Sequence, residues 1–168
     1  MRSWVPVPGT TKARLVEQAL TEFGARGFAA VGVTELARGA DVTIGSLYHH
    51  FGSKAGLYTL VREDVEQRVL DRMAGAAAIR PDDLGGVLLV GFDYLVRSGF
   101  MRLLAEPHPN RAGDPIEAFL AAVADRDGAP VSRILIAAWR AALDAAADAV
   151  RDGRDPASVR RALHQLIR

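Results

Sequence analysis

The stretch DVTIGSLYHHFGSK, residues 41–54, decides the fold because it combines helix-capping residues with an unusual density of aromatic and hydrogen-bonding side chains. Thr43 and Ser53 can each cap a helix, since a hydroxyl oxygen accepts a hydrogen bond from the backbone N–H groups that a helix start leaves free. They predict a short helix from Ile44 to Phe51 that ends at Gly52, and another helix that begins after Ser53.

Helical periodicity continues on both sides of this stretch. Thr10 or Thr11 is expected to begin a helix that ends at Gly27, and Thr34 is expected to cap a short helix from Glu35 to Gly39. After Ser53, apolar residues recur every fourth position, which predicts a long helix to about Ala78; they are Leu57, Val61, Val65, Val69 and Met73. Two short helices joined by a tight turn and flanked by longer ones form the helix-turn-helix arrangement that reads DNA.

A helix that enters a major groove needs small residues on its leading edge and hydrogen-bonding side chains around it. The small residues are Thr43, Gly45 and Ser46, and the hydrogen-bonding residues are Tyr48, His49 and Lys54. Glycine inside a helix costs about 1 kcal/mol relative to alanine, and close approach to another surface would explain Gly45. Leu47, His50 and Phe51 are predicted to face inward, with His50 hydrogen-bonded within the small domain.

Composition restricts the chain to a few classes. Its 168 residues are 49% apolar, which suits one compact domain or two small helical domains that share a core. There is no cysteine, no apolar run long enough to span a membrane and no signal peptide, so a cytoplasmic location is expected. The net charge is +1, with +2 on residues 1–60 and −1 on the remainder, so the DNA-binding prediction rests on geometry rather than on charge.

The second half of the chain predicts further helices with less specific sequence signals. One is expected to start at Pro81, and others to span Asp114–Ala124, Val131–Val150 and Ser158–Ile167. Glycines in the helix after Pro81 either make room for a ligand or a crossing helix, or simply leave that helix weakly specified. His108 lies in a loop without metal-ligand spacing around it and is expected to be exposed.

The segments ARLVEQALTEFGARGF and VGVTELARGADVTIGSLYHHFGSKAGLY, with the LYxHF core and the lysine three residues beyond it, resemble the TetR family of bacterial transcriptional regulators. The resemblance runs from Thr11 to about Leu60. It implies an all-α protein whose N-terminal three-helix helix-turn-helix domain is joined by a long helix to a C-terminal helical dimerisation and effector domain. Residues 1–9 are then a flexible tail, residues 10–56 the DNA-binding domain and residues 57–168 the second domain. Gly56 departs from the family pattern, which often has an acidic residue there.

The resemblance and the periodicity together give three sets of candidate residues. The DNA-binding set is Thr34, Thr43, Ile44, Gly45, Ser46, Tyr48, His49 and Lys54. The candidate lining of a ligand pocket is Phe92, Leu95, Val96, Arg97, Met101, Phe119, Trp139 and Arg140. The candidate dimer interface is Ile134, Leu135, Ala138, Ala141, Ala142, Ala145, Leu163 and Leu166, on two helices suited to a four-helix seam.

The predicted function is that of a homodimeric regulator, a repressor, which binds palindromic double-stranded operator DNA and is tuned by a small-molecule effector of apolar or aromatic character. The alternative is a DNA-binding regulator without such a ligand that responds to a protein partner, since 168 residues leave room for a reduced pocket or none. No catalytic motif or metal-ligand spacing is present, so no enzyme, metal or cofactor is expected. Arg2 and Trp4 belong either to a disordered tail or to an arm that enters a minor groove.

Overall fold

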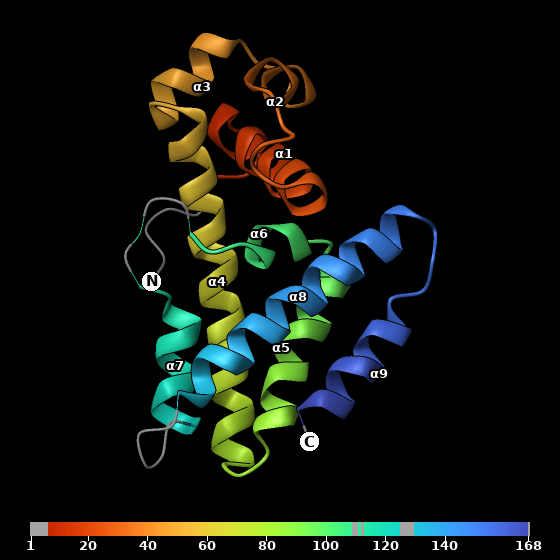
Figure 1. Ribbon diagram of the computed structural model, residues 1–168. Helices are drawn as coiled ribbons and strands as arrows, with labels where there is room; N and C mark the ends of the chain where they lie inside the picture. Colours follow the sequence, from red (N-terminus) through yellow and green to blue (C-terminus); the bar gives the residue numbers. More distant parts are fainter. Residues whose placement is uncertain (1–6, 109–110, 112, 125–129, 168) are drawn as a thin grey trace.

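A computed structural model describes residues 7–108, 111, 113–124 and 130–167 of the chain, so the expectations for Arg2 and Trp4 lie outside the described residues. These residues form α-helices packed in two regions (Figure 1). The helices are α1 (Thr11–Arg26), α2 (Val33–Gly39), α3 (Ile44–Phe51), α4 (Lys54–Ile79), α5 (Leu84–Ser98), α6 (Met101–Ala105), α7 (Pro115–Ala124), α8 (Val131–Arg151) and α9 (Ala157–Leu166). The all-α prediction is confirmed, with an N-terminal helix-turn-helix followed by a helical C-terminal domain.

Helices α1, α3 and α4 begin where hydroxyl side chains can cap them. The side chains of Thr10, Thr43 and Ser53 accept hydrogen bonds from backbone N–H groups three residues onward, at 3.2, 3.1 and 2.9 Å. The predicted cap at Thr34 is wrong: α2 begins at Val33, two residues before the predicted start at Glu35, and the carboxylate of Glu35 accepts a hydrogen bond from the backbone N–H of Gly32 at 3.4 Å. Thr34 is therefore an exposed residue within the first turn of α2.

The long helix α4 connects the two regions and runs down the molecule from α3 to α5 (Figure 1). It is continuous across residues 56 and 57, where the sequence predicts the end of the DNA-binding domain. All five residues of its predicted apolar stripe are completely buried: Leu57, Val61, Val65, Val69 and Met73. Gly56 has a structural reason, because a Cβ there would lie 2.2 Å from the backbone oxygen of Phe51. The first turn of α4 thus packs directly on the end of α3.

The C-terminal region is built around α5 and α8. Gly91 of α5 makes room for crossing helices, because a Cβ there would lie 3.2 Å from Met73 Sδ of α4 and 3.3 Å from Trp139 Cζ2 of α8. Trp139 is completely buried, and its indole N–H donates to the backbone oxygen of Leu88 at 3.0 Å. The glycines of α5 are expected either to make room for a ligand or a crossing helix or to leave the helix weakly specified. At Gly91 the small residue makes room for the crossing helices α4 and α8.

Two features of this region differ from the expectation. The helix after Pro81 begins only at Leu84, because the side chain of Asp83 accepts the N–H of Gly86 at 2.8 Å and caps it. The sequence pattern also gives no indication of α6, a five-residue helix that lies between α1 and α8 (Figure 1). No helix in the described part of the chain combines the length and the apolar character that a bilayer crossing requires.

Candidate DNA-binding surface

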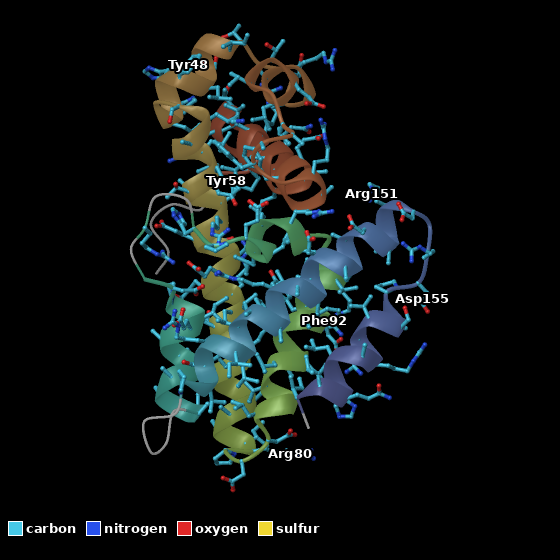
Figure 2. The ribbon with its side chains drawn as sticks, in the orientation of Figure 1. Tyr48, Tyr58, Arg80, Phe92, Arg151 and Asp155 are labelled. Carbon is cyan, nitrogen blue, oxygen red and sulfur yellow. The ribbon has the colours of Figure 1, made fainter. Side chains whose placement is uncertain are left out.

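Helix α3 is attached to its domain by one side and leaves the other side open. On its inward side, Leu47 is completely buried and Phe51 is half-buried against the core. The opposite edge of α3 is exposed, and Figure 2 shows Tyr48 on the outer side of the region formed by α1 to α3. The α3 edge therefore presents side chains to solvent without loosening the packing below it.

Most of the predicted DNA-binding residues lie on this accessible edge. Exposed are Thr34, Thr43, Ile44, Gly45, Tyr48 and His49, and Ser46 is half-buried. Thr43 Oγ1 also lies 3.0 Å from Ser46 Oγ, so the first turn of α3 carries a pair of linked hydroxyl groups. The exposed residues of α3 thus form one accessible edge that can meet a duplex, and Thr34 is exposed separately on α2.

Gly45 has open space in front of it. A Cβ built there meets only Thr43 Oγ1, at 3.7 Å, which is ordinary van der Waals contact. Its backbone has no positive φ, so the fold itself does not require glycine at this position. This agrees with a position kept small for a surface outside the chain.

Lys54 is more strongly bound within the domain than the sequence suggests. Its ammonium donates to the backbone oxygens of Phe28 and Val31, both at 2.9 Å, and lies 4.0 Å from the centre of the Phe28 ring. An ammonium has three N–H donors, so one proton is left for a phosphate. Lys54 therefore links the start of α4 to the segment before α2, in addition to the phosphate contact predicted for it.

The prediction for His50 is wrong. His50 is exposed on α3 rather than hydrogen-bonded inside the domain, and its ring packs against its neighbours, 5.2 Å from His49 and 6.1 Å from Phe51. The reason is the helical register: Leu47 and Phe51 already fill the inward face, and residue 50 lies about 100° before residue 51 around the axis. Two imidazole rings thus stand side by side on the open edge of α3.

The predicted pocket residues do not gather at one site. Leu95, Met101 and Trp139 are buried core residues, Arg97 is exposed and Phe119 is half-buried. Phe92 of α5, labelled in Figure 2, lines a groove of about 170 Å³ together with Val96. The groove lies between α5 and the start of α9, beside the ion pair of Asp93 with Arg160.

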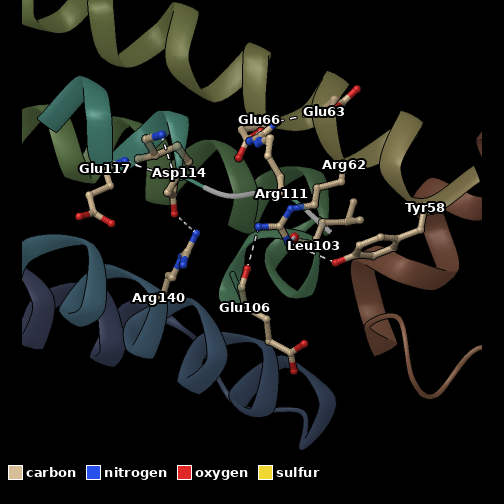
Figure 3. Close-up of polar contacts among 11 residues, drawn as sticks. Tyr58, Arg62, Glu63, Glu66, Leu103, Glu106, Arg111, Asp114, Glu117 and Arg140 are labelled. Atoms are coloured by element: carbon tan, nitrogen blue, oxygen red, sulfur yellow. Dashed lines mark hydrogen bonds and ion pairs between the residues drawn. The ribbon is translucent and has the colours of Figure 1, made fainter. Parts of the chain in front are cut away.

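Arg140 faces a different hollow, of about 240 Å³, which is lined by charged residues of the loop before α7 and of α7 itself. The Arg140 guanidinium pairs there with Asp114, and Arg111 pairs with Glu66 of α4 at 2.6 Å (Figure 3). His108 also lines this hollow and is half-buried rather than exposed. Burial lowers the pKa of His108, and the nearby Arg62 and Arg111 guanidinium groups lower it further.

The predicted dimer residues divide into exposed and inward-facing positions. Ile134, Ala141 and Ala145 form an exposed stripe on α8, and Leu166 on α9 is 71% exposed. Leu135, Ala138 and Ala142 are half-buried. Leu163 is a correction, because it is only 3% exposed in a single chain and packs in that chain's own core.

The sequence of the N-terminal region is similar to that of known regulators. Residues 15–61 match the family described as bacterial regulatory proteins, tetR family. The HTH-type transcriptional regulatory protein RaaS of Mycobacterium tuberculosis is 38% identical over 74 residues, which are 44% of this chain and 34% of that protein. The HTH-type transcriptional repressor SCO4008 of Streptomyces coelicolor is 32% identical over 87 residues, which are 52% of this chain and 43% of that protein. The matched parts thus span less than half the length of these relatives.

The fold as a whole is similar to that of a transcriptional regulator (TerR/AcrR family) from Aquifex aeolicus VF5. The TM-score is 0.62 at 17% sequence identity, and the match covers 93% of this chain and 96% of that chain. The family match falls on α1 to α3 and the start of α4, where the candidate DNA-binding edge lies. By the family match and the sequence relatives, residues 15–61 belong to the TetR family of bacterial transcriptional regulators, and the likeness to the solved structure extends to the fold of the chain as a whole.

Proposed function

We propose that this protein is a cytoplasmic repressor of transcription that binds a palindromic operator as a homodimer, with α3 of each subunit in a major groove. The observation that carries the proposal is the open edge of α3, where Gly45, Tyr48 and His49 are exposed above the buried anchor Leu47. A two-fold symmetric dimer places its two recognition helices in successive major grooves, about 34 Å apart. Repression rather than activation is supported by the relative from Streptomyces coelicolor, which is a repressor.

The partner subunit is proposed to pack on α8 and α9. Ile134 is 68% exposed although isoleucine is among the residues most often buried, and Leu166 is 71% exposed on the neighbouring helix. Ala141 and Ala145 continue the stripe on α8 with small side chains that allow a second helix to approach closely. A second copy of the same face would cover these residues by two-fold symmetry.

A small-molecule effector is proposed to bind the C-terminal domain and to change operator affinity. The groove beside Phe92 and Val96 supports the apolar effector, because Phe92 contributes a ring to its wall. The hollow beside Arg140 supports a ligand with charged or hydrogen-bonding groups. The complete burial of Leu95 and Trp139 by protein atoms favours the alternative, a regulator that responds to a protein partner.

The DNA-binding proposal is tested by incubating the purified protein with random duplexes and sequencing those it retains. A palindromic consensus is expected, and duplexes retained without any common sequence would refute sequence-specific binding. The dimer is tested by sedimentation of Ile134→Glu, which is expected to be monomeric and to lose operator affinity. Ile79→Glu is the matched control, because Ile79 is 80% exposed at the far end of α4 and should leave the dimer intact. A dimeric Ile134→Glu protein would show that the seam lies elsewhere.

A further inference from the structure

Helix α6 lies where the DNA-binding domain meets the C-terminal domain. Four of its five residues are buried, namely Met101, Leu103, Leu104 and Ala105, and the fifth is Arg102. The helix lies between α1 on one side and α8 on the other (Figure 1). It therefore separates the domain that carries α3 from the helix that carries the exposed stripe proposed to form the dimer.

The contact with α1 is close. A Cβ at Gly24 of α1 would lie 2.6 Å from the backbone oxygen of Gly99 and 3.1 Å from Phe100 Cδ1, both in the corner that leads into α6. Only glycine fits such a separation, so α1 and this corner touch backbone to backbone. Any change in the orientation of α6 therefore moves α1.

The contact with α4 is made by a buried arginine. Arg62 is completely buried, and its guanidinium donates to the backbone oxygens of Leu103 and Glu106 and to the hydroxyl of Tyr58 (Figure 3). The last carbonyl groups of a helix have no partner within the helix, so Arg62 satisfies acceptors at the end of α6. Without Arg62 the buried carbonyl group of Leu103 would lose this hydrogen bond, which is costly, so Arg62 holds α6 against α4.

The contact with α8 is ionic. The two terminal nitrogens of Arg102 pair with Asp144 and Asp148, which are four residues apart on one face of α8. A guanidinium presents its donors in a rigid planar fork, so two carboxylates one helical turn apart hold it in a single orientation. The Arg102 side chain is only 21% exposed, so dissolved salt screens this ion pair less than it would screen a fully exposed one.

We infer that Arg102 is a positioning residue that sets the separation of the two recognition helices in the dimer. This inference rests on the proposed function, because it assumes that α8 forms the seam and that α3 enters DNA. In that arrangement α8 is the fixed reference, α6 is held to it by Arg102, and α1 follows α6 through the contact at Gly24. Release of the fork allows each DNA-binding domain to rotate on its C-terminal domain.

The test uses the operator obtained from random duplexes with the wild-type protein, together with copies in which one or two base pairs are inserted or deleted between the half-sites. Affinity for each duplex is measured by fluorescence anisotropy for the wild type and Arg102→Gln. The wild type is expected to prefer its own spacing, and Arg102→Gln to reduce that preference at least about 5-fold while remaining a dimer by sedimentation. A purely structural role would weaken all spacings equally and leave the preference unchanged.

The matched control is Arg154→Gln, which breaks an ion pair with Asp152 in the turn between α8 and α9, with a nitrogen to oxygen distance of 2.8 Å. It is expected to keep the wild-type spacing preference. The double variant Asp144→Asn with Asp148→Asn removes the same link from the α8 side, at positions that are more exposed, and should reproduce the effect if Arg102→Gln fails to fold. An unchanged preference in folded, dimeric link-breaking variants overturns the inference. A wild-type protein that retains no duplex at all refutes the proposed function instead.

Discussion

Replacement of Gly45 by alanine is expected to stabilise the folded protein and to weaken its binding to DNA. The added Cβ meets only Thr43 Oγ1, at 3.7 Å, so the fold accepts it without a clash. Alanine is favoured over glycine in a helix by up to about 1 kcal/mol. For a chain of this length a gain of about 1 kcal/mol in the free energy of unfolding raises Tm by roughly 2–4 °C.

The effect on DNA binding should have the opposite sign. If the backbone at Gly45 lies against base edges in the groove, the methyl group overpacks that contact, and overpacking costs about 1–3 kcal/mol. Operator affinity would then fall by roughly 5- to 150-fold, since 1.4 kcal/mol corresponds to a factor of ten. Thermal unfolding and fluorescence anisotropy on the same preparation measure the two effects separately.

Two other glycines provide controls for this experiment. Gly75 lies inside α4, and beyond the neighbouring backbone of α4 itself no atom lies within 4 Å of the position of an added Cβ, so Gly75→Ala should gain similar stability and leave DNA affinity unchanged. Gly56→Ala should lose stability, because its Cβ would meet the backbone oxygen of Phe51 at 2.2 Å. Wild-type affinity in Gly45→Ala would refute the close approach of α3 to DNA. A lower Tm would show that glycine is needed by the fold itself.

Three further predictions concern groups placed by the structure. Lys54→Met should lower the free energy of unfolding by about 1.5–3 kcal/mol, because two hydrogen bonds from a charged donor are lost, and should flatten the salt dependence of DNA binding by about one unit of slope. Gly91→Ala should cost about 1–3 kcal/mol in chemical unfolding, because its methyl group would press on Trp139. The guanidinium of Arg26 lowers the pKa of Glu35, so that pair stabilises the fold at neutral pH and loses its effect as Glu35 is protonated in acid; Glu35→Gln should therefore reduce the acid sensitivity of Tm.

The helix boundaries that could be predicted are those set by local chemistry. Thr43 and Ser53 cap their helices within three residues, so the sequence contains both partners of each hydrogen bond. The start of α2 depends instead on a contact between residues of different helices. Arg26 of α1 pairs with Glu35 of α2 and also donates to the backbone oxygen of Ala30 at 2.6 Å. That contact between helices fixes the loop before α2 and places the cap at Gly32 rather than at Thr34.

The exposed edge of α3 could be predicted for a related reason. The inward face of α3 is set by Leu47 and Phe51, four residues apart, and the residues between them are carried outward by the helical period. The inward prediction for His50 follows the family motif, and the helical period of α3 overrides it. The separation of the predicted pocket residues into two hollows could not be predicted, because Phe92 and Arg140 belong to helices whose relative position depends on the packing of the whole C-terminal domain.

The hydrogen bonds by which Arg62 of α4 holds α6 could not be predicted from the sequence. Its apolar stripe at Leu57, Val61 and Val65 is visible as a period of four, and polar residues elsewhere on such a helix normally face solvent. Here a second stripe with the same spacing, Tyr58, Arg62 and Glu66, is buried as well. Burial of these polar groups is tolerable only because distant segments supply partners: backbone carbonyls 41 and 44 residues away for Arg62, and a guanidinium 45 residues away for Glu66. The polar residues that hold α4 against these segments therefore have partners 41 to 45 residues away along the chain, and single-helix periodicity cannot identify them.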